Sequence, residues 1–323
     1  MSVLVFLEHH GNDFEKGSLG LLAKAATLGD GEVAAVLAGG GQVTALASQA
    51  GKFGASKVYV AEDELLDPAL PQPRVDVLEQ VIRAGGHDTV LLSNSVLAAD
   101  VAAGLSARLD AGLNWDLVDI VWRSGELIGK RPALQDSVFA DVGWRTLPRL
   151  ALFRAGSFDA ASMAGREPRI EHVEVALQPH SRKATIVDQQ LQDDAGPSIE
   201  DAEVIVGGGM GLGGPENFKL AEDLAATLGG VVGATRAAVY AGWYPHSAQI
   251  GQTGKTVSPK LYFALGISGA VQHKVGMQGS KVIIAVNTDP AAPIFEFSDL
   301  AVVGDVHTIV PEVIKLLRQR RSA

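Results

Sequence analysis

The chain has 323 residues, of which 47% are hydrophobic and 20% charged, a composition typical of globular proteins with about two domains at this length. Its 27 Lys and Arg residues against 37 Asp and Glu residues give a net charge of −10. An acidic surface repels phosphate backbones, so we expect no nucleic-acid partner. The sequence contains no Cys, which excludes disulfides, thiolate metal sites and iron–sulfur clusters. It also lacks an apolar run of about 18 residues and a signal-peptide pattern, so we expect a cytoplasmic protein without membrane insertion.

Short apolar runs alternate with helical patterns along the first half of the chain. Helices are predicted at residues 19–28 and after the glycine turn at 39–41, and several short strands are expected between residues 122 and 153, as an antiparallel extension. The other strands of this half are predicted at residues 3–7, 33–37, 57–60, 89–92 and 117–121. Strands separated by helices indicate βαβ units and a parallel sheet.

A polar segment without periodicity, residues 189–198, contains Gly-Pro near its end and separates two halves of the chain. Such a segment is typical of a linker, so we expect an N-terminal domain at residues 1–188 and a C-terminal domain at residues 199–323. The second half restarts the alternation, with helices at 215–228 and 313–321 and strands at 204–206, 229–234, 260–265, 281–286 and 300–303. The predicted fold class is therefore α/β in both domains.

Gly209, Gly211 and Gly214 fit the pattern G-x-G-x-x-G between a predicted strand and a predicted helix. Small residues there admit a pyrophosphate to the helix N-terminus, which offers unpaired N–H groups, although the same pattern equally describes a tight turn. In dinucleotide-binding folds the next strand usually ends near an acidic residue that binds the ribose of NAD, and here Arg236 stands there instead. An Arg suits the 2′-phosphate of NADP or a flavin ring better. We therefore expect the C-terminal domain to be Rossmann-like.

Two other kinds of site are excluded by spacing. Residues 254–256, Gly-Lys-Thr, imitate the end of a P-loop, but Gln249 occupies the position at which a P-loop requires Gly. None of the eight His residues pair at the i, i+4 spacing of a helical metal site, so we expect no metal.

Polar and small residues follow the ends of the strands in the second half. They are Arg236, Gln252, Thr253, Asn287 and Asp305, together with a glycine-punctuated junction at residues 268–273. Because the carboxyl ends of parallel strands meet at one edge of a sheet, we expect these residues to converge on a single ligand, for which a dinucleotide is the obvious candidate. No nucleophile elbow, zinc-protease motif or conspicuous carboxylate pair accompanies them. A dinucleotide site without a catalytic acid or base indicates an electron carrier rather than an enzyme.

The second half of the chain contains a dense set of characteristic motifs. They are residues 259–262, Gly266-Ile267-Ser268-Gly269-Ala270-Val271-Gln272-His273, Gly276-Met277, Ser280-Lys281, Asn287, Asp289, residues 292–295, Asp299 and Gly304-Asp305. Through these motifs, residues 204–311 resemble the electron transfer flavoprotein α-subunit family. A looser similarity extends it over the rest of the chain through Glu8-His9, Ala25-Ala26 and Leu28-Gly29.

The resemblance implies an FAD-binding C-terminal domain and an N-terminal domain that packs with a β subunit in a heterodimer. It places Arg236 over the flavin ring, where this guanidinium and the ring of His273 would stabilise the charge that reduction adds. The residues that it implies for FAD binding are Thr235, Arg236, Ile250, Gly251, Gln252, Thr253, Ser268, Gly269, Ala270, Val271, Gln272, His273, Asn287, Asp305 and Val306. Where the family usually has Arg directly after the triple glycine, this chain has Met210, so one cationic phosphate contact is missing.

On this interpretation the chain accepts electrons from donor dehydrogenases and passes them to an acceptor such as a membrane quinone oxidoreductase, through transient contacts. Two alternatives stay open. The chain could be the NADP-binding component of a transhydrogenase-like oxidoreductase, with Arg236 on the 2′-phosphate, or a scaffold with a vestigial nucleotide site, which only Met210 favours.

Overall fold

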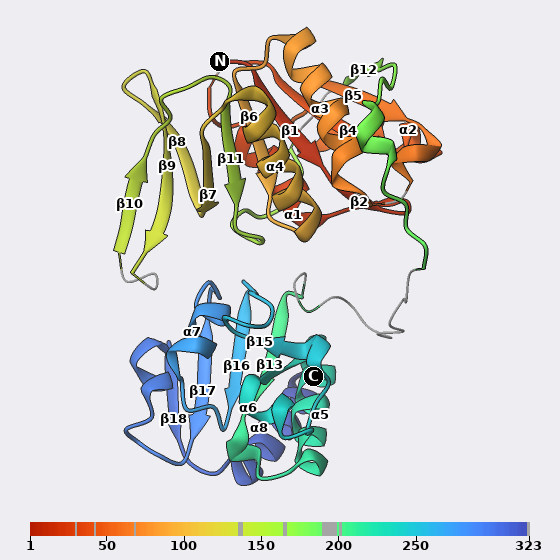
Figure 1. Ribbon diagram of the computed structural model, residues 1–323. Coiled ribbons are helices and arrows are strands. Elements are labelled where there is room, and N and C mark those ends of the chain that lie inside the picture. The colour runs from red at the N-terminus through yellow and green to blue at the C-terminus, as the bar shows by residue number, and fades with distance from the viewer. Residues whose placement is uncertain are drawn as a thin grey trace. The chain divides into compact units, whose positions relative to one another are not determined.

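The chain forms two compact units, Met1–Leu191 and Gln192–Ala323, which Figure 1 colours from red to green and from green to blue. The computed structural model describes residues 1–29, 31–41, 43–67, 69–134, 138–163, 167–188, 199 and 202–321. The linker predicted at residues 189–198 lies outside these described residues. Among the helices that are described, none is long and apolar enough to cross a membrane.

A parallel sheet of seven strands forms the centre of the first unit, as the alternation predicted. In spatial order the strands are β12 (Arg169–His172), β5 (Lys57–Glu62), β4 (Val33–Gly39), β1 (Val3–Leu7), β6 (Thr89–Ser93), β11 (Arg149–Phe153) and β7 (Leu113–Leu117). Every neighbouring pair is parallel. The strands β1, β4 and β6 are buried along their whole length, which is why they read as continuous apolar runs rather than as alternating ones.

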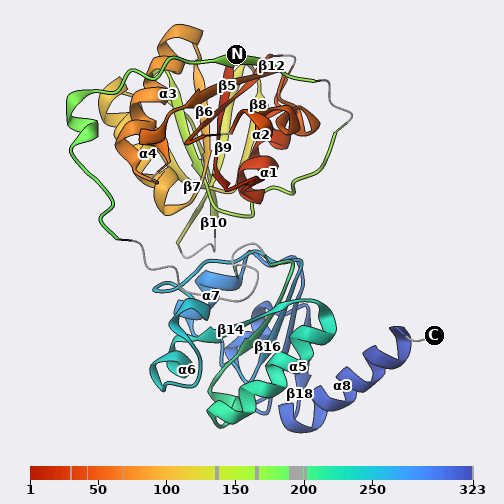
Figure 2. The same cartoon turned by 90° about the vertical axis from the view of Figure 1, so that its right-hand side faces the viewer.

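Helices cover both faces of this sheet. Successive side chains of a strand point to opposite faces, so Val5 packs on one side with α1 (Lys16–Ala25) and α2 (Thr44–Ala50), and Phe6 packs on the other with α3 (Pro71–Gly85) and α4 (Val96–Leu109). Figure 2 shows these two pairs of helices on either side of the strands. Local sequence sets the helix ends: Pro71 opens α3 and Gly86 closes it in the left-handed region, and the Ser95 hydroxyl accepts the Ala98 amide at the start of α4.

One predicted strand of the first unit was wrong. Residues 117–121 were expected as a single strand, but β7 ends at Leu117 and a new strand, β8 (Asp119–Arg123), begins after Val118. The two strands belong to different sheets, because the Val118 amide bonds to the Lys130 carbonyl and so turns the chain away from the parallel sheet. An apolar run records burial and not the partner of each residue, so it could not reveal this break.

The antiparallel extension expected between residues 122 and 153 is present. It is a sheet of three strands, β8, β9 (Glu126–Ala133) and β10 (Val138–Val142), joined in antiparallel pairs. Ser124 and Gly125 both have positive φ at the turn between β8 and β9, as tight hairpins with the favoured twist require. A short antiparallel pair, β2 (His9–His10) and β3 (Asp13–Phe14), lies before α1.

The second unit contains a wholly parallel sheet of six strands. Their spatial order is β15 (Gln249–Ile250), β14 (Val231–Thr235), β13 (Val204–Gly208), β16 (Leu261–Leu265), β17 (Ile283–Asn287) and β18 (Leu300–Val303). The five predicted strands are confirmed with small shifts of their ends, and β15, which has two residues, is additional.

Helices also cover both faces of the second sheet. Val206 packs against α5 (Phe218–Leu228), α6 (Arg236–Tyr240) and α8 (Val306–Arg321), whereas Tyr262 packs on the side of α7 (Val271–Met277). The last helix begins at Val306 and not at residue 313 as predicted. Pro311 lies in its second turn, where it removes one backbone hydrogen bond but does not end the helix, so the helix also includes the residues before Pro311.

The order of the strands defines where a ligand can enter the second unit. From β13 the chain crosses to β14 and β15 on one side of it, and then returns to β16 on the other side. The carboxyl ends of the strands at such a reversal, here β13 and β16, are the usual position of a ligand in open parallel sheets. The Rossmann-like α/β class predicted for this unit is confirmed.

Candidate functional site

The glycine motif at the carboxyl end of β13 packs against the neighbouring loop. The Gly209 amide donates to the Leu265 carbonyl and the Gly211 amide to the Gly266 carbonyl, both at 2.9 Å. A Cβ on Gly211 would lie 2.6 Å from the Gly266 Cα, so only glycine permits this approach. Two amides that a phosphate would need are therefore already bonded within the protein, which favours the tight turn over a phosphate site.

The loop after β16 offers the backbone donors that the glycine motif lacks. Across the described residues, no protein acceptor bonds to the amides of Ser268, Gly269 and Ala270. The loop is nevertheless fixed from behind, because the Ser268 carbonyl accepts the Ile294 amide at 2.9 Å and the Asn287 side chain donates to the Ile267 carbonyl at 2.9 Å. Adjacent free amides in a held loop form an anion-binding concavity, suited to a pyrophosphate.

Arg236 follows the carboxyl end of β14. Thr235 caps α6 through its hydroxyl, which accepts the Ala238 amide, and this cap fixes Arg236 as the first helical residue. Its guanidinium lies 4.9 Å from the centre of the exposed Tyr240 ring, and within the described part of the chain no carboxylate pairs with it. A planar, permanently charged group without an ion-pair partner can face an aromatic ring or an anion.

Residues 250–253 form a loop that is tied to the start of α7. The Gln252 amide donates to the Gln272 carbonyl at 2.7 Å, and a Cβ on Gly251 would meet that carbonyl oxygen at 2.6 Å. Gln249 is 1% exposed and donates to the Thr253 carbonyl at 3.0 Å. Held in this way, the exposed side chains of Gln252 and Thr253 remain available for a ligand.

The ring of His273 is buried and does not face solvent. Its Nδ1 donates to the Ile250 carbonyl at 3.1 Å and its Nε2 accepts from the Tyr262 hydroxyl at 3.0 Å, because a carbonyl can only accept. Burial lowers the pKa of His273 to about 4, so the ring is neutral near pH 7. This corrects the expectation that the ring carries charge to the flavin: with both nitrogens occupied, it joins α7 to the loop at Ile250.

Asn287, Asp305 and Val306 follow β17 and β18. The two side-chain ends of Asn287 bond to the Ile267 carbonyl and to the Asp289 amide, so this residue positions the loop after β16. Asp305 is exposed and accepts the His307 amide at the start of α8, which leaves part of its carboxylate for a ligand. The Val306 side chain is 3% exposed and belongs to the core. Val306 and Ile250 can therefore reach a ligand only through their backbones.

The parallel sheet brings all of the expected residues to one edge, after the carboxyl ends of five strands. They are Thr235 and Arg236 after β14; Ile250, Gly251, Gln252 and Thr253 at β15; Ser268, Gly269, Ala270, Val271, Gln272 and His273 after β16; Asn287 at the end of β17; and Asp305 and Val306 after β18. The combination fits FAD, since free amides suit its pyrophosphate, Arg236 its ring and Asp305 a ribose hydroxyl. Sequence reasoning missed Tyr262 and Gln249, and a polar group within an apolar strand was the only signal. No metal-binding group of His, Asp and Glu occurs among the residues described.

Comparison with known proteins gives the same assignment over the whole chain. Residues 3–178 match the family described as the electron transfer flavoprotein domain, and residues 198–278 match the electron transfer flavoprotein FAD-binding domain. The chain is 39% identical to electron transfer flavoprotein subunit alpha of Mycobacterium leprae over 325 residues, 99% of each chain. It is 36% identical to the subunit of Syntrophomonas wolfei over 315 residues, 98% of each. It is also 36% identical to the mitochondrial subunit of Oryza sativa, over 99% of this chain and 92% of the other.

These similarities do not support the NADP-binding transhydrogenase alternative, since both family matches and the three relatives named above are electron transfer flavoproteins. FAD is the cofactor of the second unit, in agreement with the free amides and the free guanidinium at the edge of its sheet. The chain belongs to the electron transfer flavoprotein α-subunit family.

Proposed function

We propose that this chain works in a heterodimer with an electron transfer flavoprotein β subunit and carries electrons without substrate chemistry of its own. It would accept them from dehydrogenases and deliver them to an oxidoreductase such as a membrane quinone reductase. The observation that carries the proposal is that Arg236, which has no carboxylate partner among the described residues, and the free amides of Ser268–Ala270 follow strands of one sheet at its carboxyl edge. The sequence contains no nucleophile motif beside them. FAD supplies the redox chemistry when bound.

Different residues at the carboxyl edge of this sheet would bind different parts of FAD. The amides of the 268–270 loop donate to the pyrophosphate, the exposed Gln252 and Thr253 side chains bond to the polar side of the ring system, and Asp305 accepts from a ribose hydroxyl. Arg236 would lie over the ring. Its permanent charge favours the reduced, more negative state, so it raises the potential at which electrons are accepted.

The antiparallel sheet β8–β9–β10 is the surface that we propose for the β subunit. One face packs into the core through Ile120 and Leu127. On the opposite face, the side chains of Val121 and Phe139 are 39% and 59% exposed. Exposed aromatic and aliphatic side chains gathered on one small sheet are typical of a subunit interface.

Purification of the chain together with its β subunit tests the proposal. We expect one co-eluting complex whose visible spectrum is that of a flavin. For a Phe139→Ser variant, we expect a smaller fraction of the β subunit to co-elute with the chain. The matched control is Val303→Ser, which changes a side chain of similar exposure, 56%, on the second unit. A colourless complex, or a monomer that holds FAD and exchanges electrons at full efficiency, would contradict the proposal. A cytoplasmic location belongs to the same proposal; it rests on the composition without Cys, and cell fractionation checks it.

A further inference from the structure

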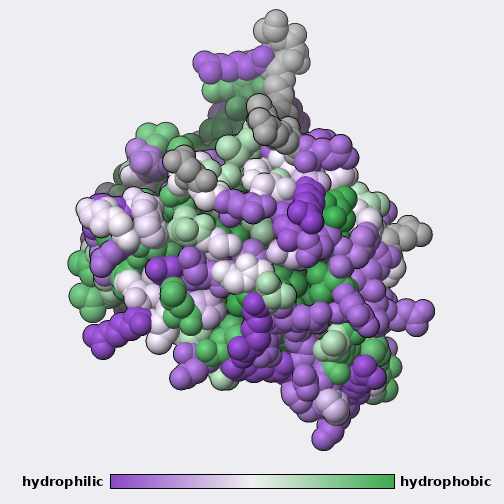
Figure 3. All heavy atoms as spheres, turned by 90° about the horizontal axis from the view of Figure 1, so that it is seen from above, coloured by the Kyte–Doolittle hydropathy of each residue, from purple (hydrophilic) through white to green (hydrophobic). Residues whose placement is uncertain are grey.

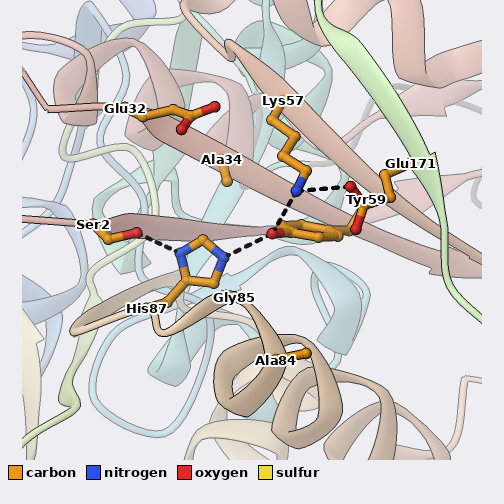
Figure 4. A pocket seen from close by; sticks show the side chains of 9 residues that line it. All are labelled: Ser2, Glu32, Ala34, Lys57, Tyr59, Ala84, Gly85, His87 and Glu171. Atoms are coloured by element: carbon orange, nitrogen blue, oxygen red, sulfur yellow. Dashed lines mark hydrogen bonds and ion pairs between the residues drawn. The ribbon is translucent and has the colours of Figure 1, made fainter.

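A polar cavity of about 240 Å³ lies at the amino-terminal edge of the sheet in the first unit. Ser2 precedes β1, Glu32 precedes β4, Lys57 opens β5, and Glu171 lies on β12. Figure 4 shows these side chains around the cavity, with the last turn of α3 at its base. Figure 3 views the molecule from the side of these strand ends, where strongly hydrophilic residues are mixed with apolar ones. The FAD site lies at a carboxyl edge in the other unit, so this cavity is a separate feature.

A chain of hydrogen bonds crosses the cavity floor. Lys57 Nζ donates to the Tyr59 hydroxyl at 2.8 Å, His87 Nε2 lies 3.4 Å from the same oxygen, and His87 Nδ1 lies 2.9 Å from the Ser2 hydroxyl. Tyr59 and His87 are only 6% and 7% exposed. The dashed lines in Figure 4 follow this chain and its continuation from Lys57 to Glu171.

These hydrogen bonds leave one hydroxyl proton without an acceptor. If the Tyr59 hydroxyl donates to His87 Nε2, then His87 Nδ1 donates to the Ser2 hydroxyl, and the Ser2 hydroxyl proton has no acceptor among these four residues. In the other tautomer Ser2 donates to His87 and His87 to Tyr59, so the Tyr59 proton is left, because Lys57 can only donate. In both cases one O–H group on the cavity wall needs an acceptor from outside.

The charges around the cavity favour a cation. Lys57 is neutralised by Glu171, whose carboxylate lies 2.8 Å away. His87 stays neutral near pH 7, because burial and the nearby Lys57 lower its pKa. The Glu32 carboxylate has no hydrogen-bond or ion-pair partner within the described portion of the chain. At Ala84 and Gly85 the carbonyl end of α3 also reaches the cavity, and helix C-termini carry partial negative charge.

We propose that this cavity binds a small organic cation, a primary ammonium compound that also carries one hydrogen-bond acceptor. The ammonium would lie between Glu32 and the carbonyl end of α3, and the acceptor would receive the spare hydroxyl proton of Ser2 or Tyr59. The cavity holds the volume of about eight waters, at roughly 30 Å³ each, and is smaller than the pockets that enclose drug-sized ligands. The ligand is therefore a compact metabolite of a few non-hydrogen atoms, and its binding is independent of the electron-transfer site.

Calorimetric titration of the complete FAD-containing complex with three matched compounds tests this assignment. β-Alaninamide has both an ammonium and an acceptor, propylammonium lacks the acceptor, and propionamide lacks the charge. We expect saturable binding of β-alaninamide and about tenfold weaker binding of each of the others, as loss of one good polar contact implies. Added salt should weaken the binding of β-alaninamide, because the attraction between its ammonium and Glu32 is electrostatic.

Two variants complete the test. Glu32→Gln should weaken the binding of β-alaninamide about tenfold. Ala84→Phe, at an exposed position in the last turn of α3, should abolish binding by filling the cavity. Glu64→Gln, an exposed residue on a different segment, is the control and should bind as the parent does. Unchanged flavin absorbance and subunit association would establish that the variants are folded. Absence of saturable β-alaninamide binding, equal binding of propionamide, or binding that Glu32→Gln and Ala84→Phe leave intact would overturn the assignment.

Discussion

The Tyr262 hydroxyl donates to Nε2 of His273 at 3.0 Å, and this contact orients a buried ring that joins three segments around the FAD site. Because Nε2 is the acceptor, the proton of the ring is on Nδ1, which donates to the Ile250 carbonyl at 3.1 Å. A strand, a helix and a loop that are separate in sequence are thereby joined at one buried ring. The ring adds a second link between the loop at residues 250–253 and the start of α7, beside the bond from the Gln252 amide to the Gln272 carbonyl.

Replacement of Tyr262 by Phe should destabilise the second unit without changing its shape. The variant leaves Nε2 of His273 buried without a donor, which costs about 1–3 kcal/mol in the free energy of unfolding. Urea denaturation of the reconstituted complex measures this. Tyr240→Phe, at a ring that is 68% exposed, is the control and should change stability by less than about 0.5 kcal/mol. Equal stability of the two variants would mean that the Tyr262 contact contributes nothing.

The stability of the second unit should fall in mild acid because of His273. Its pKa is about 4 in the folded chain and about 6.5 when unfolded, so the folded state favours the neutral ring. As pH falls from about 6.5 to about 4, the unfolded chain binds the proton first, and roughly 3 kcal/mol of stability is lost across this window. Urea titrations at several pH values measure the slope. His273→Gln keeps a donor and an acceptor but does not titrate, so this part of the slope should disappear; a parent-like slope in the variant would refute the assignment.

Gly269→Ala should disrupt the loop that offers free amides. Gly269 has φ +90°, and a Cβ there would lie 2.2 Å from the Ile294 amide nitrogen, so the variant combines backbone strain with a steric clash. Gly242→Ala separates the two effects, since Gly242 has φ +74° and no atom within 4 Å of the Cβ position. We expect a loss of about 1 kcal/mol for Gly242→Ala and a further 1–3 kcal/mol, roughly, for Gly269→Ala, together with faster FAD release on dialysis. Similar FAD retention in both variants would argue against the loop as the pyrophosphate site.

Arg236→Ala should lower the reduction potential of the bound flavin, because a permanent positive charge favours the reduced state. For a one-electron step, about 59 mV corresponds to about 1.4 kcal/mol, and we expect a change of that order. Arg236→Lys keeps the charge but loses the plane, so it should fall between Ala and the parent. Spectroelectrochemical titration of the three complexes gives the potentials. Arg320→Ala removes the same charge near the end of α8, about 20 Å along the helix axis from its start at Val306, and serves as the control. Equal potentials in all four proteins would leave Arg236 with a structural role only.

Met210→Arg should slow the loss of FAD. Met210 is 47% exposed on the turn after β13, at the position where the resemblance leads us to expect Arg. A charge-assisted phosphate contact contributes roughly 1.5–3 kcal/mol when well formed, enough to slow release by about tenfold or more. Dialysis followed by flavin absorbance measures the rate, and Met210→Gln controls for added polarity without charge. If the Arg variant releases FAD as fast as the parent does, the bonded amides of Gly209 and Gly211 have already removed this turn from phosphate binding.

The sequence by itself determined the fold class and the edge at which the site lies. Strands such as β1 and β4 are buried on both faces, and so they appear in the sequence as uninterrupted apolar runs between helices. Once the strands are parallel, residues that follow them must lie at one edge, which is why Arg236, Ser268 and Asp305 could be grouped without coordinates.

Only the tertiary structure decided which groups at that edge are free. Gly209 and Gly211 fit a phosphate-binding pattern, but their amides donate to carbonyls of the loop after β16. His273 belongs to the site by position, yet its ring bonds to Tyr262 and to the Ile250 carbonyl. The break between β7 and β8, and the cavity beside Glu32, likewise depend on neighbours that are distant in the chain. Periodicity records whether a side chain is buried, whereas a hydrogen bond requires a particular partner at about 3 Å, and that partner is set by strand order and loop packing.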